Sequence, residues 1–184
     1  MAVGANLPSR GVAPADSVRS ALDMLERLAG VPVRRSRLWR TPAFPPGAGP
    51  DFVNAAAAFR WSGPARGVLD LLHRIEDAHG RKRTARWEAR VMDLDLIAMG
   101  GEVLPDAATQ ARWAALSPQD AAREMPDRLI LPHPRLAERA FVLAPLCDVG
   151  PDWRHPVTGL TAAEMLQALP AEAMAGVTPL EPSG

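Results

Sequence analysis

Two aspartates spaced two positions apart inside an apolar segment constrain the fold of this 184-residue chain more than any other feature. Asp93 and Asp95 lie in the segment 92–99, and all its other residues are apolar. Side chains on a strand alternate between two faces, so the spacing predicts a strand with both carboxylates on one face and Leu94 and Leu96 towards the core. Adjacent carboxylates repel each other, and the pair is stable mainly when a proton or a divalent cation lies between them.

Positive charge is concentrated just before this strand. Positions 81–90 hold five basic residues and one acid, in a chain with 21 basic and 21 acidic residues in total. Guanidinium groups fit phosphate oxygens bidentately, and a carboxylate pair suits Mg²⁺, so the combination indicates a site for polyphosphate transfer. The basic segment and the aspartate pair each have a simpler explanation when taken alone. Runs of arginine are often solvated loops, and Asp-x-Asp pairs often lie at strand ends that face water.

Length and composition predict one domain, since 184 residues with 47% hydrophobic content can form one sizeable core. Zero formal net charge argues against a general nucleic-acid or membrane-surface binder. No apolar run reaches the roughly 20 residues of a membrane span, and the N-terminus lacks a secretory pattern. With a single cysteine, Cys147, no internal disulfide can form. We therefore expect a cytoplasmic protein without a nucleic-acid or membrane partner. We also expect a monomer.

Hydrophobic periodicity predicts alternating strands and helices. Helices are expected at 14–29, at 64–79 and after the capping box at 161–164, and strands at 31–40, 53–61 and 92–99. Residues 105–127 are rich in Ala, Gln and Arg, and we expect one or two short surface helices around Trp113. A Pro-rich and Gly-rich loop at 41–50 suits a stiff pocket wall.

Phe52 and Asn54, which follow this loop, have side chains that can bind a flat ring. Phe52 offers a face for stacking, and the Asn54 amide can both donate to and accept from a ring edge. Taken alone, Phe52 is more simply a core aromatic.

Residues 86–95, Arg-Trp-x-x-Arg-x-x-Asp-Leu-Asp, resemble the signature of the 6-hydroxymethyl-7,8-dihydropterin pyrophosphokinase family. Further blocks match in the same order, so the resemblance covers about residues 3–169 apart from the inserted segment 105–127. These blocks are Gly-Ala-Asn-Leu at 4–7, Arg-Thr-Pro at 40–42, Phe-x-Asn at 52–54, Pro-His-Pro at 132–134 and Arg-x-Phe-x-Leu at 139–143. The chain departs from the family at 88–89, where Glu-Ala replaces the usual Gly-Pro or Gly-Ala.

The resemblance implies an α+β fold, a ferredoxin-like sandwich with a four-stranded antiparallel core sheet covered by helices. We expect one pyrophosphokinase domain over residues 1–170, interrupted by the inserted segment 105–127. Residues 171–184 are expected to be a disordered tail.

The implied activity is transfer of a diphosphate from ATP to 6-hydroxymethyl-7,8-dihydropterin, giving AMP and the pterin diphosphate in folate biosynthesis. The resemblance assigns two Mg²⁺ ions to Asp93 and Asp95, charge neutralisation to Arg81 and Arg90, and acceptance of the hydroxyl proton to Asp93. It assigns ATP binding to Glu76, Arg83, Trp87, Arg128, His133 and Arg139. It assigns pterin binding to Thr41, Pro42, Phe44, Phe52, Asn54 and Phe141.

Two other functions remain open from the residues alone. A single-stranded nucleic-acid module would use Arg81–Arg90 and Trp87 for backbone and stacking contacts, with steep salt dependence and no need for ATP. A Mg²⁺-dependent phosphohydrolase would use Asp93 and Asp95 to release phosphate from ATP without a pterin. AMP that appears only when the pterin alcohol is present would identify the transferase.

Overall fold

One antiparallel sheet organises the computed structural model, which describes residues 1–9, 11–43, 49–80 and 92–181. Its strands are β1 (Ala2–Ala5), β2 (Val33–Arg35), β3 (Trp39–Thr41), β4 (Phe52–Phe59), β5 (Asp93–Asp95) and β6 (Thr178–Pro179). Their order is β5-β1-β4-β3-β6, and β2 also pairs with β4. β1 has only four residues, but it occupies an inner position between β4 and β5.

The antiparallel sheet with helices confirms the α+β expectation, whereas the four-stranded core is not confirmed. The predicted strand 31–40 is divided into β2 and β3, which pair with opposite ends of β4. Between them, the Ser36 hydroxyl accepts a hydrogen bond from the Ala56 N–H at 2.8 Å, so a side chain replaces the backbone partner there. The strand expected at 92–99 is also shorter, because the ladder extends only over β5.

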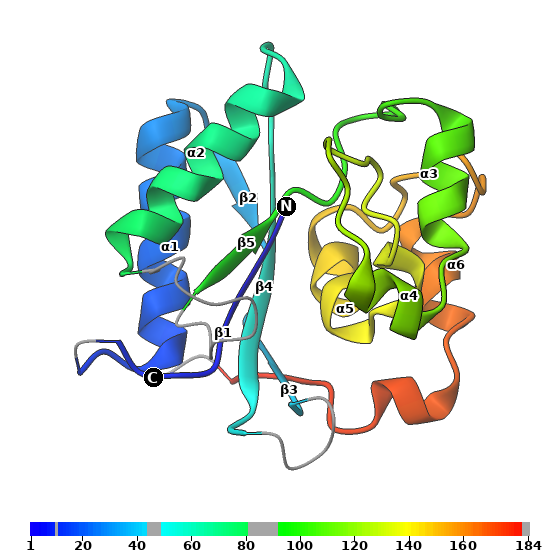
Figure 1. The fold of residues 1–184 in the computed structure, drawn as a ribbon. Coiled ribbons are helices and arrows are strands. Elements are labelled where there is room, and N and C mark those ends of the chain that lie inside the picture. The colour runs from blue at the N-terminus through cyan, green and yellow to red at the C-terminus, as the bar shows by residue number, and fades with distance from the viewer. Residues whose placement is uncertain (10, 44–48, 81–91, 182–184) are drawn as a thin grey trace.

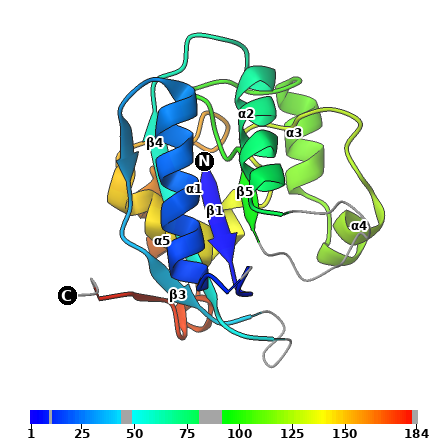
Figure 2. The same cartoon turned by 90° about the vertical axis from the view of Figure 1, so that its left-hand side faces the viewer.

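Two helices cover one face of the sheet, as Figures 1 and 2 show. They are α1 (Pro14–Ala29) and α2 (Ala65–Ala78), close to their predicted bounds. α1 starts with proline in its first turn and ends at Gly30, whose φ of 66° suits a residue without a Cβ. Their apolar stripes pack against Val3, Ala55 and Leu94 to form the larger hydrophobic core.

The opposite face is partly covered by the C-terminal half of the chain. α5 (Ala140–Val149) packs against β4 and against α6 (Ala162–Gln167), which begins at the predicted capping box. The Asp148 carboxylate on α5 accepts hydrogen bonds from Arg37 and from the Trp39 indole, which ties α5 to β3. A second core forms here around Ile97, Leu136, Val142, Leu143 and Met165.

The inserted segment contains two short helices, as predicted. These are α3 (Ala107–Ala114) and α4 (Pro118–Arg123). Trp113 is only 8% exposed, so it anchors α3 inward instead of lying on the surface. Within the described residues, no helix has the length and apolarity that crossing a membrane requires.

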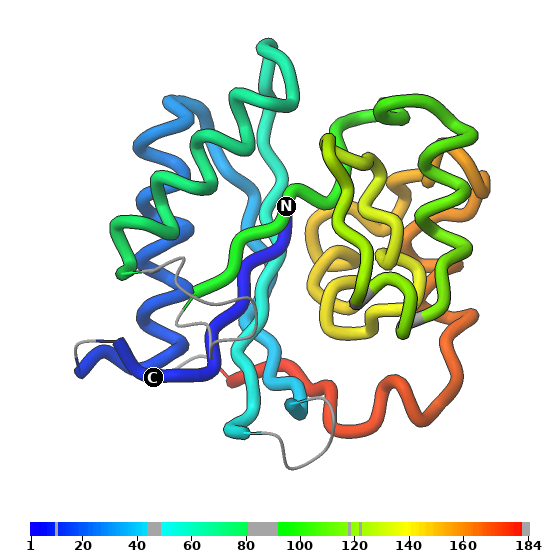
Figure 3. The backbone as a smooth tube through the Cα atoms, viewed as in Figure 1, coloured from blue at the N-terminus to red at the C-terminus, as the bar shows by residue number. Residues whose placement is uncertain are grey.

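The expectation of a disordered tail is wrong for residues 171–181. The 3₁₀ helix η2 (Ala171–Met174) is followed by β6, which pairs with β3 (Figure 3). The Leu180 N–H also donates to the Leu38 carbonyl at 2.7 Å. The free edge of β3 offers backbone groups that a short extended segment can satisfy without a hydrophobic pattern of its own.

We expect deletion of residues 177–184 to lower the free energy of unfolding by only about 1–2 kcal/mol, because the deletion removes few backbone hydrogen bonds and β6 is exposed. Leu25→Ala should cost about 2–5 kcal/mol, since Leu25 is completely buried on α1. Urea unfolding of both variants measures the difference. A deletion that costs as much as Leu25→Ala would mean that the tail is part of the core.

Candidate active site

The strand register sets the carboxylates beside the predicted ring-binding residues. Gly4 on β1 lies opposite Asp93 on β5 and opposite Asn54 on β4. Directly opposed residues of antiparallel strands project from the same face, so Asp93 and Asn54 share a face with a glycine between them. The face is the one that α5 partly covers, because Trp39, opposite Asn54 in the register, reaches Asp148 on that helix.

Asp93 and Asp95 occupy this face as predicted. Both are partly buried, whereas Leu94 between them is 5% exposed and belongs to the core on the other face. No group of three or more His, Cys, Asp or Glu suited to a metal ion is found in the described part of the chain. A pair of carboxylates supplies only part of a cation's coordination shell and leaves the other positions to water or to a bound substrate.

Asn54 and Thr41 form a buried polar contact. The Asn54 Nδ2 donates to the Thr41 Oγ1 at 2.8 Å, and the two residues are 8% and 3% exposed. Gly4 makes this arrangement possible, because a Cβ at that position would lie 2.4 Å from the Asn54 Oδ1. Glycine is therefore required here for the close approach of a side chain from the neighbouring strand.

His133 and Arg139 lie within electrostatic range of the carboxylate pair. Burial and the nearby Arg139 and Arg135 cations lower the pKa of His133 to about 4, while Asp93 acts in the opposite direction. Burial likewise lowers the pKa of Arg139, and Asp95 and Asp93 oppose that effect. The His133 Nδ1 accepts from the Arg135 N–H at 3.1 Å, so the neutral ring carries its proton on Nε2.

Arg135 was missed by sequence reasoning. Its side chain is 20% exposed and pairs with Glu138 at 2.5 Å, and its charge acts on both His133 and Arg139. The sequence signal that could have found it is its position two residues after His133, which was predicted to bind ATP. Arg135 lies between two matching family blocks, 132–134 and 139–143, and so belonged to neither.

Glu76 is completely buried, and its Oε1 accepts a hydrogen bond from the Leu94 N–H at 2.9 Å. This contact joins α2 to the strand that carries both aspartates. Contact of Glu76 with ATP stays a prediction, and the observed bond indicates that Glu76 positions β5.

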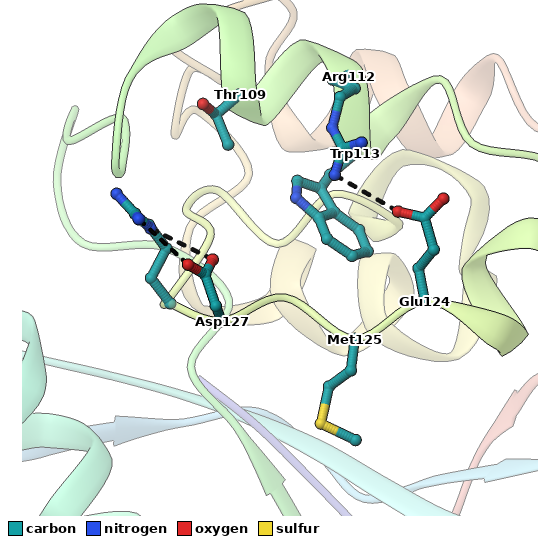
Figure 4. Close-up of a pocket in the computed structure, with 7 residues that line it drawn as sticks. Thr109, Arg112, Trp113, Glu124, Met125 and Asp127 are labelled. Carbon is teal, nitrogen blue, oxygen red and sulfur yellow. Dashed lines mark hydrogen bonds and ion pairs between the residues drawn. The ribbon is translucent and has the colours of Figure 1, made fainter.

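Arg128 directly follows the inserted segment 105–127. Its guanidinium is exposed and pairs with Asp127 at 3.1 Å. Both residues line a hollow of about 460 Å³ (Figure 4), together with Thr109, Arg112, Trp113, Glu124 and Met125. The predicted contact of Arg128 with ATP is not tested by this placement.

Phe52 and Phe141, two aromatic residues that the resemblance assigns to the pterin, lie on different elements, β4 and α5. Phe52 is partly buried at the start of β4, and Phe141 is 40% exposed with the Arg139 guanidinium 5.7 Å from its ring centre. The ring–ring contacts found among the described residues involve neither phenylalanine. Contact of Phe52 and Phe141 with the pterin stays a prediction. Pro42 is exposed beside the buried Thr41.

Several predicted residues fall outside the described ranges. They are Phe44, Arg81, Arg83, Trp87 and Arg90, together with the departure at Glu88.

A sequence model described as 7,8-dihydro-6-hydroxymethylpterin-pyrophosphokinase matches residues 1–151. The chain belongs to this family. It is 35% identical over 173 residues to the 2-amino-4-hydroxy-6-hydroxymethyldihydropteridine pyrophosphokinase of Pseudomonas aeruginosa, covering 94% of this chain and 91% of that protein. It is 33% identical to the Synechocystis enzyme of the same name over 165 residues, covering 89% of this chain and 74% of that protein.

The structure of wild-type HPPK-DHPS from Plasmodium falciparum has a similar fold, with a TM-score of 0.59 and 13% sequence identity. The similarity covers 90% of this chain and 43% of that longer protein. As a member of the pyrophosphokinase family, the chain is an ATP-dependent diphosphotransferase of folate biosynthesis. Neither the nucleic-acid module nor the phosphohydrolase is supported by these relatives.

We expect His133 to make stability depend on pH. Its pKa of about 4 in the folded state is below the ordinary 6.5, so between these values the unfolded chain binds a proton that the folded protein does not. The free energy of unfolding therefore carries no penalty from His133 above about pH 6.5. It declines as the pH falls towards 4, by up to about 1.4 kcal/mol per pH unit.

His133→Gln should flatten the pH dependence of the unfolding free energy across this window, because glutamine does not bind a proton there. Its side-chain oxygen can still accept the hydrogen bond from the Arg135 N–H. Urea unfolding between pH 4 and 7 measures the difference between the two proteins. Parallel curves would show that His133 does not resist protonation.

Proposed function

We propose that this pyrophosphokinase carries out diphosphate transfer on the sheet face that bears Asn54, Asp93 and Asp95. The observation that carries the proposal is the register, because Asp93, Gly4 and Asn54 form one row across three strands. A pterin bound at Asn54 would then have its hydroxyl near the carboxylates, and placement of this kind supplies much of the rate in phosphoryl transfer.

The pterin would bind where β4 begins. Phe52 and Asn54 are two positions apart and share a face, and Thr41 lies opposite Phe52 on β3. The Asn54 amide gives one N–H to Thr41 and keeps its second N–H for the edge of the ring. Phe52 would stack on the ring, Phe141 at the start of α5 would provide the second face, and Pro42 and Phe44 would complete the wall.

The donor set at Asp93 and Asp95 fits Mg²⁺, a hard cation that usually takes one or two protein carboxylates and completes its octahedron with water and phosphate oxygens. We expect two ions there. When bound with ATP, they would neutralise charge on the phosphate oxygens. Asp93 would accept the proton of the pterin hydroxyl, which a carboxylate on this face can reach.

The nucleotide would extend from the carboxylates towards the His133 segment. Neutral His133 offers one donor, Nε2–H, and Arg139 offers a partly buried cation for phosphate oxygens. Glu76 would hold β5 in place through Leu94. The remaining predicted contacts belong to Arg83, Trp87 and Arg128, with Arg81 and Arg90 neutralising charge at the transferred group. A monomeric, cytoplasmic enzyme without nucleic-acid or membrane partners also stays a prediction.

Asp95→Ala should lower AMP formation from ATP and the pterin alcohol at saturating Mg²⁺ by at least about a hundredfold, since removal of a charge-stabilising group costs on that order. Separation of AMP, ADP and phosphate by chromatography measures the reaction. Asp70→Asn is the control, because Asp70 is exposed on α2 and pairs only with Arg66 among the described residues. Full activity of Asp95→Ala would rule out the carboxylate pair as the centre of the reaction.

Phe52→Ala should raise the KM for the pterin by about tenfold, because stacking on an aromatic ring contributes about 1 kcal/mol or more. The KM for ATP should stay within about twofold. Phe59→Ala on the same strand is the matched control, since Phe59 faces the core and packs edge-on against Trp61. Equal effects of the two substitutions on the pterin KM would place the ring elsewhere.

A further inference from the structure

The inserted segment contains a buried amide that the proposed chemistry does not use. Gln110 on α3 is 3% exposed and lies one turn before Trp113, on the inward face of the helix. Burial of an amide is unfavourable unless the group is hydrogen-bonded. The partner of Gln110 therefore indicates why a polar side chain occupies this inward position.

That partner is the backbone just before His133. The Gln110 Nε2 donates to the Pro132 carbonyl at 3.2 Å, and Pro132 is itself less than 2% exposed. Within the described residues, no backbone N–H bonds to this carbonyl. The donor from the inserted segment thus satisfies a buried acceptor in the Pro-His-Pro block.

The same peptide unit is held at its other end. The His133 N–H donates to the Ile97 carbonyl at 2.8 Å. The Pro132 carbonyl and the His133 N–H belong to one planar peptide group, so bonds at both ends set its orientation. One bond comes from α3, and the other comes from Ile97, two residues after Asp95. These two hydrogen bonds therefore fix the backbone of His133 relative to the carboxylates on β5.

We propose that Gln110 is a positioning residue, through which the inserted segment orients His133 for the nucleotide. The inference rests on the proposed contact between His133 and ATP. Gln110 acts through the Pro132 carbonyl and is not itself a substrate contact. An apolar residue of the same size would fill the space equally well, but it would leave the buried carbonyl without its donor, and the peptide plane could then rotate.

α3 has supports other than this amide. The helix begins at Asp106, whose carboxylate accepts from the Thr109 N–H at 2.8 Å and from the Thr109 hydroxyl. Trp113 supplies the buried apolar contact. The bond from Gln110 to Pro132 therefore connects two parts that are held independently, as a positioning contact requires.

The test is Gln110→Met, which keeps the side-chain length and removes the donor. We expect the KM for ATP to rise about three- to tenfold, the effect of one lost hydrogen bond, while the KM for the pterin stays within about twofold. Steady-state kinetics with each substrate varied in turn measures the split. Val18→Ala, a buried substitution on α1, is the control for lower stability and should change neither KM.

His133→Ala separates the inference from the proposed function. If this variant keeps the wild-type KM for ATP, the proposed contact of His133 is wrong and the inference falls with it. If His133→Ala raises the KM for ATP and Gln110→Met does not, the inference alone is overturned. If both single variants raise the KM for ATP, adding Gln110→Met to the His133→Ala variant should raise that KM little further, because the two residues act through one element. Fully additive effects would contradict the positioning role.

Discussion

The register of one four-residue strand is the constraint on which the site depends. β1 pairs with β4 on one side and β5 on the other, so Gly4 lies between Asn54 and Asp93. A slip of one residue in either ladder would turn the carboxylates or the amide to the opposite face. Glycine at this point also leaves space for the Asn54 side chain, which any Cβ would fill. A short inner strand can hold this register because both of its edges are paired.

The two faces of the sheet have different roles: one forms the main hydrophobic core, and the other carries the proposed site. One is sealed by α1 and α2 over an apolar core, and this packing accounts for most of the buried hydrophobic residues. On the other face, Asp148 ties α5 to β3, and Asp93 and Asp95 are only partly buried. Burial of apolar side chains on one face thus stabilises the strands. This stabilisation offsets the unfavourable free energy of holding the carboxylates of Asp93 and Asp95 close together on the other face.

Several buried polar groups connect the site to its support. Asn54 bonds to Thr41, Glu76 to the Leu94 N–H, and Gln110 to the Pro132 carbonyl. Each bond joins two separate segments of the chain. The first joins two proposed pterin contacts, and the other two hold the backbone next to Asp93 and next to His133. Buried hydrogen bonds of this kind are directional, so they define geometry in a way that apolar packing alone does not.

Local patterns in the sequence determined the helices at 14–29 and 64–79, the long strand β4, the shared face of Asp93 and Asp95, and the family. Periodicity and short motifs carry this information because they depend on neighbours within a few residues. Only the tertiary structure decided that β2 and β3 are separate, that the tail adds β6, and that Gln110 reaches Pro132. These features depend on hydrogen bonds between distant segments, and no local pattern records which segments will meet.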